Sequence, residues 1–155
     1  MSVILSIDPG TSLSAFVVLE TEDYKILDKG KVENDVLIGM VRTGYFDMLA
    51  IEGFQSFGMP VGKEVFDTAY HIGRLLQIAE DLGSKTRMVY RSDVKLHHCL
   101  TPRAKDANIR QVMLDRFGAQ GTKKSPGVTY GISKDMWSAL AIATYVADTM
   151  GEKNV

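Results

Sequence analysis

Two apolar runs separated by a turn sequence open this chain and restrict the folds open to it. Residues 3–8 (VILSID) and 13–20 (LSAFVVLE) are rich in β-branched and apolar residues, and the Pro-Gly-Thr-Ser between them is typical of a turn. This pattern predicts a β-hairpin. The first strand ends on Asp8, a carboxylate that is costly to bury unless it is paired or binds a metal ion. Asp-Pro-Gly is also common in turns, so this position alone leaves both interpretations open.

The remaining segments alternate between predicted helices and strands. Apolar spacing predicts strands over residues 24–32, 47–52 and 86–90, and helices after Asn34, over 63–82, from an N-cap at Ser92, over 104–117, and from an N-cap at Ser133 to about 150. Three consecutive strands followed by helix–strand alternation predict an α/β fold with a mixed five-stranded sheet and helices on both faces. The first and fourth strands should be neighbours. Residues 1–155 are expected to form a single domain.

Charge is distributed unevenly along the chain. Residues 1–84 contain 6 Lys/Arg and 13 Asp/Glu, whereas residues 85–124 contain 10 Lys/Arg and 3 Asp/Glu. A solvated surface explains most charge runs, but a concentrated basic third also fits a face that binds nucleic acid. The single cysteine, Cys99, fits a reducing cytosol. No segment has the pattern of a secretion signal or of a membrane-spanning helix, so no membrane partner is expected.

Three acids are predicted to meet at one edge of the sheet. Asp8 and Glu52 each end an apolar strand, and the ends of adjacent parallel strands lie about 4.8 Å apart. Two carboxylates this close repel each other unless a divalent cation lies between them. Asp135 is expected in the first turn of the last helix, where the helix dipole favours its ionised form. Turn formation, strand-end solvation and first-turn charge each explain one acid alone, but their common placement favours a site for one or two Mg²⁺.

Several segments of the chain resemble the RuvC-type Holliday junction resolvases of the RNase H-like superfamily. They are ILSIDPGTSLSAFVVL, LAIEGF, TAYHIGRLLQIA, VYRSDVKLHHCLTPRAKDANIRQVM and KDMWSALAIATYV, in that order over nearly the whole chain. The short chain and its spacing are most similar to the phage-borne branch. The resemblance implies Mg²⁺-dependent cleavage of four-way junctions or other branched DNA by a homodimer, with two Mg²⁺ ions that Mn²⁺ can replace. It also implies the cytoplasm of a bacterium or of a phage-infected host.

The resemblance assigns roles to individual residues. Asp8, Glu52 and Asp135 match the catalytic and metal-binding acids of the family. Lys105 matches a catalytic lysine near the scissile phosphate, and Lys95 matches a further DNA-contacting lysine. A lysine suits contact with a phosphate oxygen, although ordinary surface charge also explains both. Further DNA contacts are expected from Arg103, Lys123, Lys124 and the aromatic residues Phe54 and Phe57, which either stack on bases or fold back onto the core.

The last helix departs from the family pattern. The family has two aspartates three residues apart there, but this chain has Asp135 followed by Ser138. A hydroxyl is a weaker, neutral Mg²⁺ ligand, so Ser138 either weakens one metal position or gives way to another acid such as Glu64 or Asp67. A different RNase H-like nuclease acting on hybrids or flaps, and a junction-binding protein without activity, remain alternatives. His97 and His98 do not indicate a zinc site, because adjacent residues on a helix should point apart.

Overall fold

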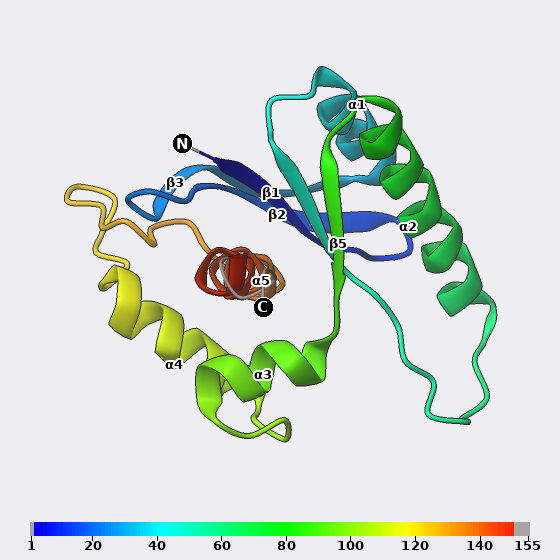
Figure 1. Ribbon diagram of the computed structural model, residues 1–155. Helices are drawn as coiled ribbons and strands as arrows, with labels where there is room; N and C mark the ends of the chain where they lie inside the picture. The colour runs from blue at the N-terminus through cyan, green and yellow to red at the C-terminus, as the bar shows by residue number, and fades with distance from the viewer. Residues whose placement is uncertain (1, 151–155) are drawn as a thin grey trace.

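One mixed sheet with helices on both faces makes up the computed structural model, which describes residues 2–150 (Figure 1). The strands are β1 (Val3–Asp8), β2 (Leu13–Glu20), β3 (Lys25–Glu33), β4 (Met48–Glu52) and β5 (Lys85–Val89), in the order β3-β2-β1-β4-β5. The first three are antiparallel, whereas β1, β4 and β5 run parallel. The predicted five-stranded sheet is therefore confirmed, including the contact between the first and fourth strands.

The two faces of the sheet carry separate cores because side chains alternate along each strand. Ile4, Val17 and Ala50 face the helices α3 (Arg91–Cys99), α4 (Asp106–Phe117) and α5 (Met136–Thr149). Leu5, Phe16 and Leu49 face the other way, towards α1 (Asn34–Thr43) and α2 (Lys63–Asp81). The α5 helix packs along β1 and β2 and is covered in turn by α3 and α4 (Figure 1). Helices thus cover both faces, as the sequence predicts.

Three of the predicted helix starts are wrong by one or more residues. Tyr90, not Ser92, is the N-cap of α3, and α4 begins at Asp106 rather than at residue 104. Asp135, not Ser133, is the N-cap of α5. Neither the N-cap of α3 nor that of α5 uses its side chain as a cap acceptor, so the preference for hydroxyl caps is not decisive here. Among the described residues, no helix is long and apolar enough to cross a membrane.

Leu100 ends α3 in a left-handed conformation that favours glycine. Its φ is 64° and 86% of the residue is exposed, so it adopts an unfavourable backbone conformation without gaining packing. We expect Leu100→Gly to raise the free energy of unfolding by about 0.5 kcal/mol, because glycine adopts this conformation without steric cost. Urea unfolding measures the change. Leu96→Gly, one turn earlier inside the helix, is the control and should lower stability by about 1 kcal/mol. A loss of stability in Leu100→Gly would contradict the prediction.

Candidate active site

Asp8 and Glu52 lie side by side at the carboxyl edge of the sheet. Ile7 of β1 is opposite Ile51 of β4 in parallel register, so the next residue of each strand is an acid. Asp8 is only 8% exposed. Burial raises the pKa of Asp8 to about 8, and the negative charges of Glu52 and Asp135 add to the effect. The structure thus places together the two acids that strand order predicts.

A glycine with a close neighbour lies two residues after Asp8 and another directly after Glu52. A Cβ on Gly10 would overlap the carbonyl oxygen of Leu13, and a Cβ on Gly53 would overlap Sδ of Met88. The N–H of Gly53 also donates to the carbonyl oxygen of Val89 at 2.8 Å. The Gly10 approach lies in the turn between β1 and β2, and the Gly53 hydrogen bond joins the end of β4 to β5 where the Glu52 carboxylate emerges.

The turn after Asp8 is held by side chains from β2 and α1. The Asn34 amide donates to the carbonyl oxygens of Gly10, at 3.0 Å, and Thr11, at 3.1 Å. Ser14 Oγ donates to Asn34 Oδ1 at 2.7 Å and accepts from the N–H of Gly10 at 3.2 Å. Asp-Pro-Gly therefore does form a fixed turn, and it does so beside the acidic site rather than instead of it.

Asp135 comes from α5 but lies one position outside the helix. It is the N-cap residue, whereas a first-turn position was predicted. Lys31 Nζ of β3 donates to Asp135 Oδ2 at 2.7 Å. Ser6 Oγ of β1 donates to the carbonyl oxygen of Ala139 at 2.6 Å, which ties α5 to the strand that carries Asp8. Asp135 is close enough to raise the pKa of Asp8, although it already has a cationic partner.

Arg91 is a residue of the site that the sequence interpretation missed. It is the first residue of α3, two residues after the end of β5, and its Nε donates to Glu52 Oε1 at 3.1 Å. The Arg91 side chain lines both the cavity that contains Asp8 and Glu52 and the cavity that contains Asp135 and Ser138. Since β5 neighbours β4 in parallel, its carboxyl end also had to reach this edge, and that was the available signal.

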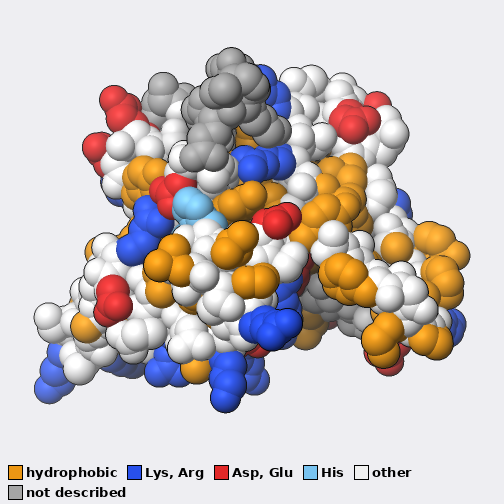
Figure 2. All heavy atoms as spheres, turned by 60° about the horizontal axis from the view of Figure 1, so that its bottom comes forward, with side chains coloured by type: hydrophobic (Ala, Val, Ile, Leu, Met, Phe, Trp, Pro, Cys, Tyr) orange, Lys and Arg blue, Asp and Glu red, His pale blue; other side chains and the backbone are white. Residues whose placement is uncertain are grey.

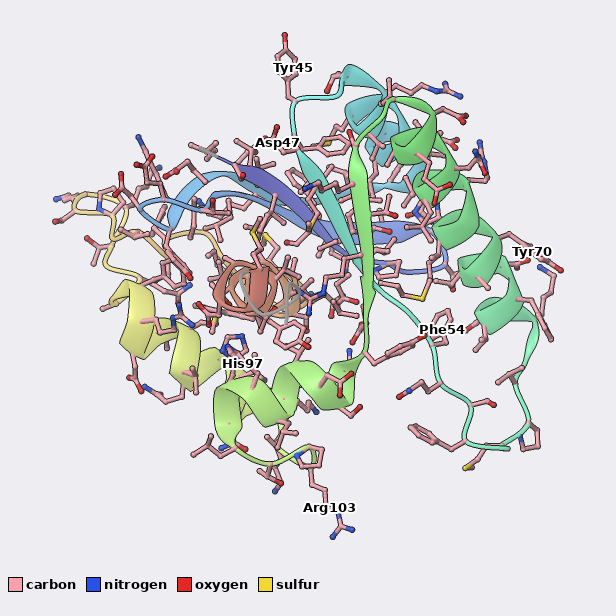
Figure 3. All side chains as sticks on the ribbon, in the orientation of Figure 1. Tyr45, Asp47, Phe54, Tyr70, His97 and Arg103 are labelled. Atoms are coloured by element: carbon pink, nitrogen blue, oxygen red, sulfur yellow. The ribbon has the colours of Figure 1, made fainter. Side chains whose placement is uncertain are left out.

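The predicted basic residues occupy different places around this edge. Lys95 lines the same cavity as Asp8 and Glu52, is 15% exposed, and pairs with Asp106 Oδ1 at 3.4 Å. Lys105 is the exposed N-cap of α4 and lines none of the described cavities at the edge. Arg103 projects from the loop between α3 and α4 (Figure 3). Lys123 and Lys124 are exposed in the loop before α5 and lie outside these cavities.

The predicted aromatic residues lie in the loop between β4 and α2. Phe54 and Phe57 line the cavity that contains Asp8 and Glu52, whose volume is about 480 Å³. Phe57 is 81% exposed, so it does not fold back onto the core, and Phe54 is half-exposed (Figure 3). Figure 2 brings the lower side of Figure 1 forward. On the face that it shows, hydrophobic side chains gather in the right-hand part, and Lys and Arg lie along the lower edge.

The fourth acid of the family pattern has no direct replacement at Ser138. Ser138 lines a small cavity together with Glu52, Arg91 and Asp106. Glu64 and Asp67, the alternatives from α2, line none of the described cavities at this edge, and Asp67 Oδ2 accepts from Lys63 Nζ at 2.6 Å. The additional acid of this region is therefore Asp106, which the sequence interpretation did not consider.

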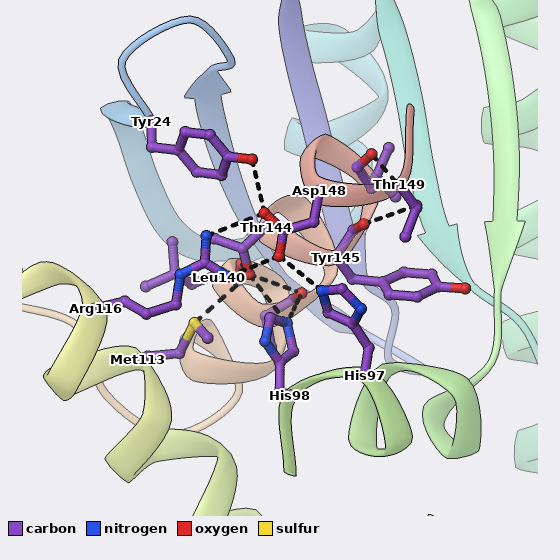
Figure 4. A network of polar contacts seen from close by, with 12 residues as sticks. Tyr24, His97, His98, Met113, Arg116, Leu140, Thr144, Tyr145, Asp148 and Thr149 are labelled. Atoms are coloured by element: carbon purple, nitrogen blue, oxygen red, sulfur yellow. Dashed lines mark hydrogen bonds and ion pairs between the residues drawn. The ribbon is translucent and has the colours of Figure 1, made fainter. Parts of the chain in front are cut away.

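A second polar cluster lies where α5 packs against α3 and α4 (Figure 4). His97 Nε2 contacts Asp148 Oδ2 at 2.7 Å, and the rings of His97 and His98 lie 4.9 Å apart. Both rings face α5, so the expectation that they point apart was wrong: each bonds an acceptor on that helix. Arg116 donates to both oxygens of Asp148, and the Tyr24 hydroxyl donates to Oδ1 at 2.6 Å. Asp148 is therefore saturated by protein donors.

These donors make Asp148 a structural residue. Burial alone would raise the pKa of Asp148, but the hydrogen bonds from Arg116, His97 and Tyr24 hold it well below its usual range. We expect Asp148→Asn to lower the free energy of unfolding by about 1–3 kcal/mol, because three donors lose a charged acceptor. Thermal unfolding with Asp115→Asn as control measures this, since among the described residues Asp115 accepts a side-chain hydrogen bond from Gln111 alone, on the surface of α4. Equal stability of the two variants would contradict the structural role.

The residues at the sheet edge fit a divalent cation. Asp8 is buried, and in the described part of the chain no N–H group or lysine donates to its carboxylate; its close neighbour is another carboxylate, Glu52. A buried acid in this position needs a proton or a cation, and carboxylate oxygens are the ligands that Mg²⁺ prefers. Asp8, Glu52 and, after release from Lys31, Asp135 are the residues that would hold it.

Comparison with known proteins connects this architecture to a group of solved structures. No protein-family model matches the sequence, and no curated protein is significantly similar to it in sequence. Thermus thermophilus RuvC matches with a TM-score of 0.70 and 17% identity over 97% of this chain and 96% of that chain. T. thermophilus RuvC in complex with a Holliday junction substrate matches with a TM-score of 0.74 and 16% identity, over 97% of each chain.

A third structure extends the likeness to another organism. The yeast mitochondrial Holliday junction resolvase Ydc2 matches with a TM-score of 0.58 and 10% identity, over 93% of this chain and 75% of that one. At these identities the similarity concerns the fold, and it agrees with the strand order observed here. The chain thus has the RNase H-like fold of the RuvC-type Holliday junction resolvases.

Proposed function

We propose that this protein is a Mg²⁺-dependent, structure-selective endonuclease that cuts four-way junctions and other branched DNA. The observation that carries the proposal is the pair of acids Asp8 and Glu52, fixed beside each other where two parallel strands end. Ligands of open α/β sheets bind at this edge. The likeness of the fold to junction resolvases supports branched DNA as the substrate.

The chain's own residues would position the cation and the DNA backbone. Asp8 and Glu52 hold the cation on rigid strands, and Asp135 approaches from the start of α5. When bound at these residues, Mg²⁺, or Mn²⁺ in its place, would supply activation of a water molecule and stabilisation of the leaving oxygen of the phosphodiester. Lys95, inside the cavity, is better placed than Lys105 to contact the phosphate being cut.

Residues outside the acid cavity would bind the arms and centre of the junction. The exposed lysines and arginines after β5, including Arg103, Lys105, Lys123 and Lys124, would contact phosphates, which supply most of the affinity of such proteins. Phe54 and Phe57 lie at the rim of the cavity with exposed ring surface. Stacking on an unpaired base contributes about 1–3 kcal/mol, and a junction centre offers unpaired or distorted bases.

A four-way junction has two strands to cut, and a homodimer would provide one site for each. Phe66 and Tyr70 of α2 are large side chains that remain exposed, and Tyr70 projects outward from the helix (Figure 3). Exposed hydrophobic residues grouped in this way are typical of interaction surfaces. We therefore assign α2 to the dimer interface. In sedimentation experiments the wild-type protein should be a dimer and Phe66→Glu a monomer. A monomeric wild-type protein would contradict the assignment.

The test of the proposed function is cleavage of labelled substrates of different shapes. A four-way junction, a flap, a linear duplex and an RNA–DNA hybrid of matched sequence are incubated with the protein in Mg²⁺ and in Mn²⁺. The proposal expects the junction to be cut fastest, in a reaction that stops when the cation is chelated. Faster cutting of the hybrid would favour another RNase H-like nuclease. Junction binding without any cutting in either cation would favour the junction-binding protein without activity.

A further inference from the structure

The acidic site contains fixed positive charges beside two of its three carboxylates. Arg91 Nε donates to Glu52 Oε1 at 3.1 Å, and Lys31 Nζ donates to Asp135 Oδ2 at 2.7 Å. Only Asp8 has no cationic hydrogen-bond partner among the described residues. With all three carboxylates ionised, Asp8, Glu52 and Asp135 together with Arg91 and Lys31 carry one net negative charge, and the neighbouring Lys95–Asp106 pair adds none. This is far less than the four acids of the family pattern would carry without such partners.

The position of Arg91 connects the acids with the place of the missing aspartate. Arg91 lines the cavity of Asp8 and Glu52, the cavity of Asp135 and Ser138, and the small cavity in which Glu52 and Ser138 meet. Its side chain therefore lies between Glu52 and the start of α5. A guanidinium and a neutral hydroxyl share this region, and its further acid, Asp106, is paired with Lys95 at 3.4 Å, whereas a second divalent ion would need free carboxylate ligands.

We propose that Arg91 is a built-in cation of this site and takes the place of one divalent ion, so that the site binds a single Mg²⁺ at Asp8 and Glu52. Relative to the family pattern, Ser138 removes the aspartate that would hold a second ion. The guanidinium of Arg91 then provides the positive charge that this ion would have supplied. Arginine suits this role because it stays charged and can contact phosphate oxygens while paired with a carboxylate. This inference rests on the proposed function, because it concerns the number of cations at the same nuclease site.

Counting bound Mn²⁺ tests the inference without relying on activity. Cation-free protein is titrated with Mn²⁺, and the free ion is measured by its electron paramagnetic resonance signal. The wild-type chain should bind one ion at the site, and Asp8→Asn should lose it. Arg91→Gln combined with Ser138→Asp should bind two ions, whereas Arg91→Lys combined with Ser138→Asp should bind one because the charge is kept. Arg42→Gln, which removes an exposed arginine from α1, is the matched control and should still bind one.

A second readout covers ions that bind only together with DNA. Below saturation, the rate of junction cutting by the wild-type protein should rise in proportion to the Mg²⁺ concentration. Cutting by the variant that combines Arg91→Gln with Ser138→Asp should depend on the square of that concentration if it cuts at all.

Two ions that the wild-type chain binds and Asp8→Asn does not, or a second-order Mg²⁺ dependence of wild-type cutting, would overturn the inference and leave the proposed function standing. One ion on the folded variant with Arg91→Gln and Ser138→Asp would also overturn it. No Mn²⁺ binding at all, with no difference between wild type and Asp8→Asn, would overturn the inference and the proposed function together. Thermal unfolding of each variant establishes that it is folded, and the wild-type count decides the question even where a variant is not.

Discussion

Asp8→Asn is expected to lower the rate of junction cutting by about 10³-fold or more while junction binding stays within about threefold of the wild-type value. The loss is large because Asp8 is the one acid of the site without a cationic partner in the described chain, so cation binding depends on it most. A group that stabilises charge in the transition state typically contributes on this scale. Binding persists because most of the affinity comes from phosphate contacts outside the acid cavity.

Single-turnover cleavage and a gel-shift titration of the same labelled junction measure the two effects separately. Asp81→Asn is the control, because Asp81 is an exposed acid at the end of α2 whose carboxylate, within residues 2–150, accepts from Gln77 alone. It should cut and bind as the wild type does. Cutting by Asp8→Asn at a rate near that of the control would remove Asp8 from the catalytic site.

The second large effect is a dependence of stability on pH that the cation should weaken. The pKa of Asp8 is about 8 in the folded protein, against 3.8 without the fold. Because the folded value is higher, the folded state holds its proton more tightly, and the stability of the cation-free protein should fall as pH rises from about 4 to about 8. One group shifted this far contributes on the order of 5 kcal/mol across that window. Above about pH 8 the contribution should level off.

Denaturant unfolding at several pH values tests this by the difference between wild type and Asp8→Asn. Other groups titrate in both proteins, so subtraction leaves the contribution of Asp8 together with its interaction with Glu52, and the asparagine variant should be the more stable one at pH 8. Saturating Mg²⁺ should narrow that difference, since a ligand at 100 times its Kd stabilises the folded state by about 2.7 kcal/mol. A stability difference between wild type and Asp8→Asn that does not depend on pH would mean that folding does not raise the pKa of Asp8. A difference that Mg²⁺ leaves unchanged would mean that Asp8 does not face a cation.

The parts of the site that follow from strand order were predictable from the sequence. Asp8 and Glu52 end apolar strands, and parallel pairing of those strands brings their last residues together whatever the loops do. The sheet and its layers follow from the same alternation of apolar residues. Strand order does not determine where a helix begins. The position of Asp135, one residue before α5 rather than in its first turn, was therefore not predicted.

The electrostatic partners were the harder part. Arg91 looks like one more residue of a basic segment until β5 is known to end beside β4, and Lys31 meets Asp135 only because β3 reaches across to the start of α5. His97 and His98 both face α5 because Nε2 of each ring contacts an acceptor on that helix. The spacing of residues along α3 does not predict these contacts. Contacts between residues distant in sequence decide which acids are already neutralised, and hence how many cations the site needs.

Anomalous scattering from crystals grown or soaked in Mn²⁺ would test most directly whether the sheet edge is a cation site. The structure offers two groups of candidate ligands, the acids at the ends of β1 and β4 and the cluster of His97, His98 and Asp148. We expect a peak within about 2.5 Å of carboxylate oxygens of both Asp8 and Glu52. A map with no peak at those two acids, or with a peak only at the histidine cluster, would contradict the assignment of the active site.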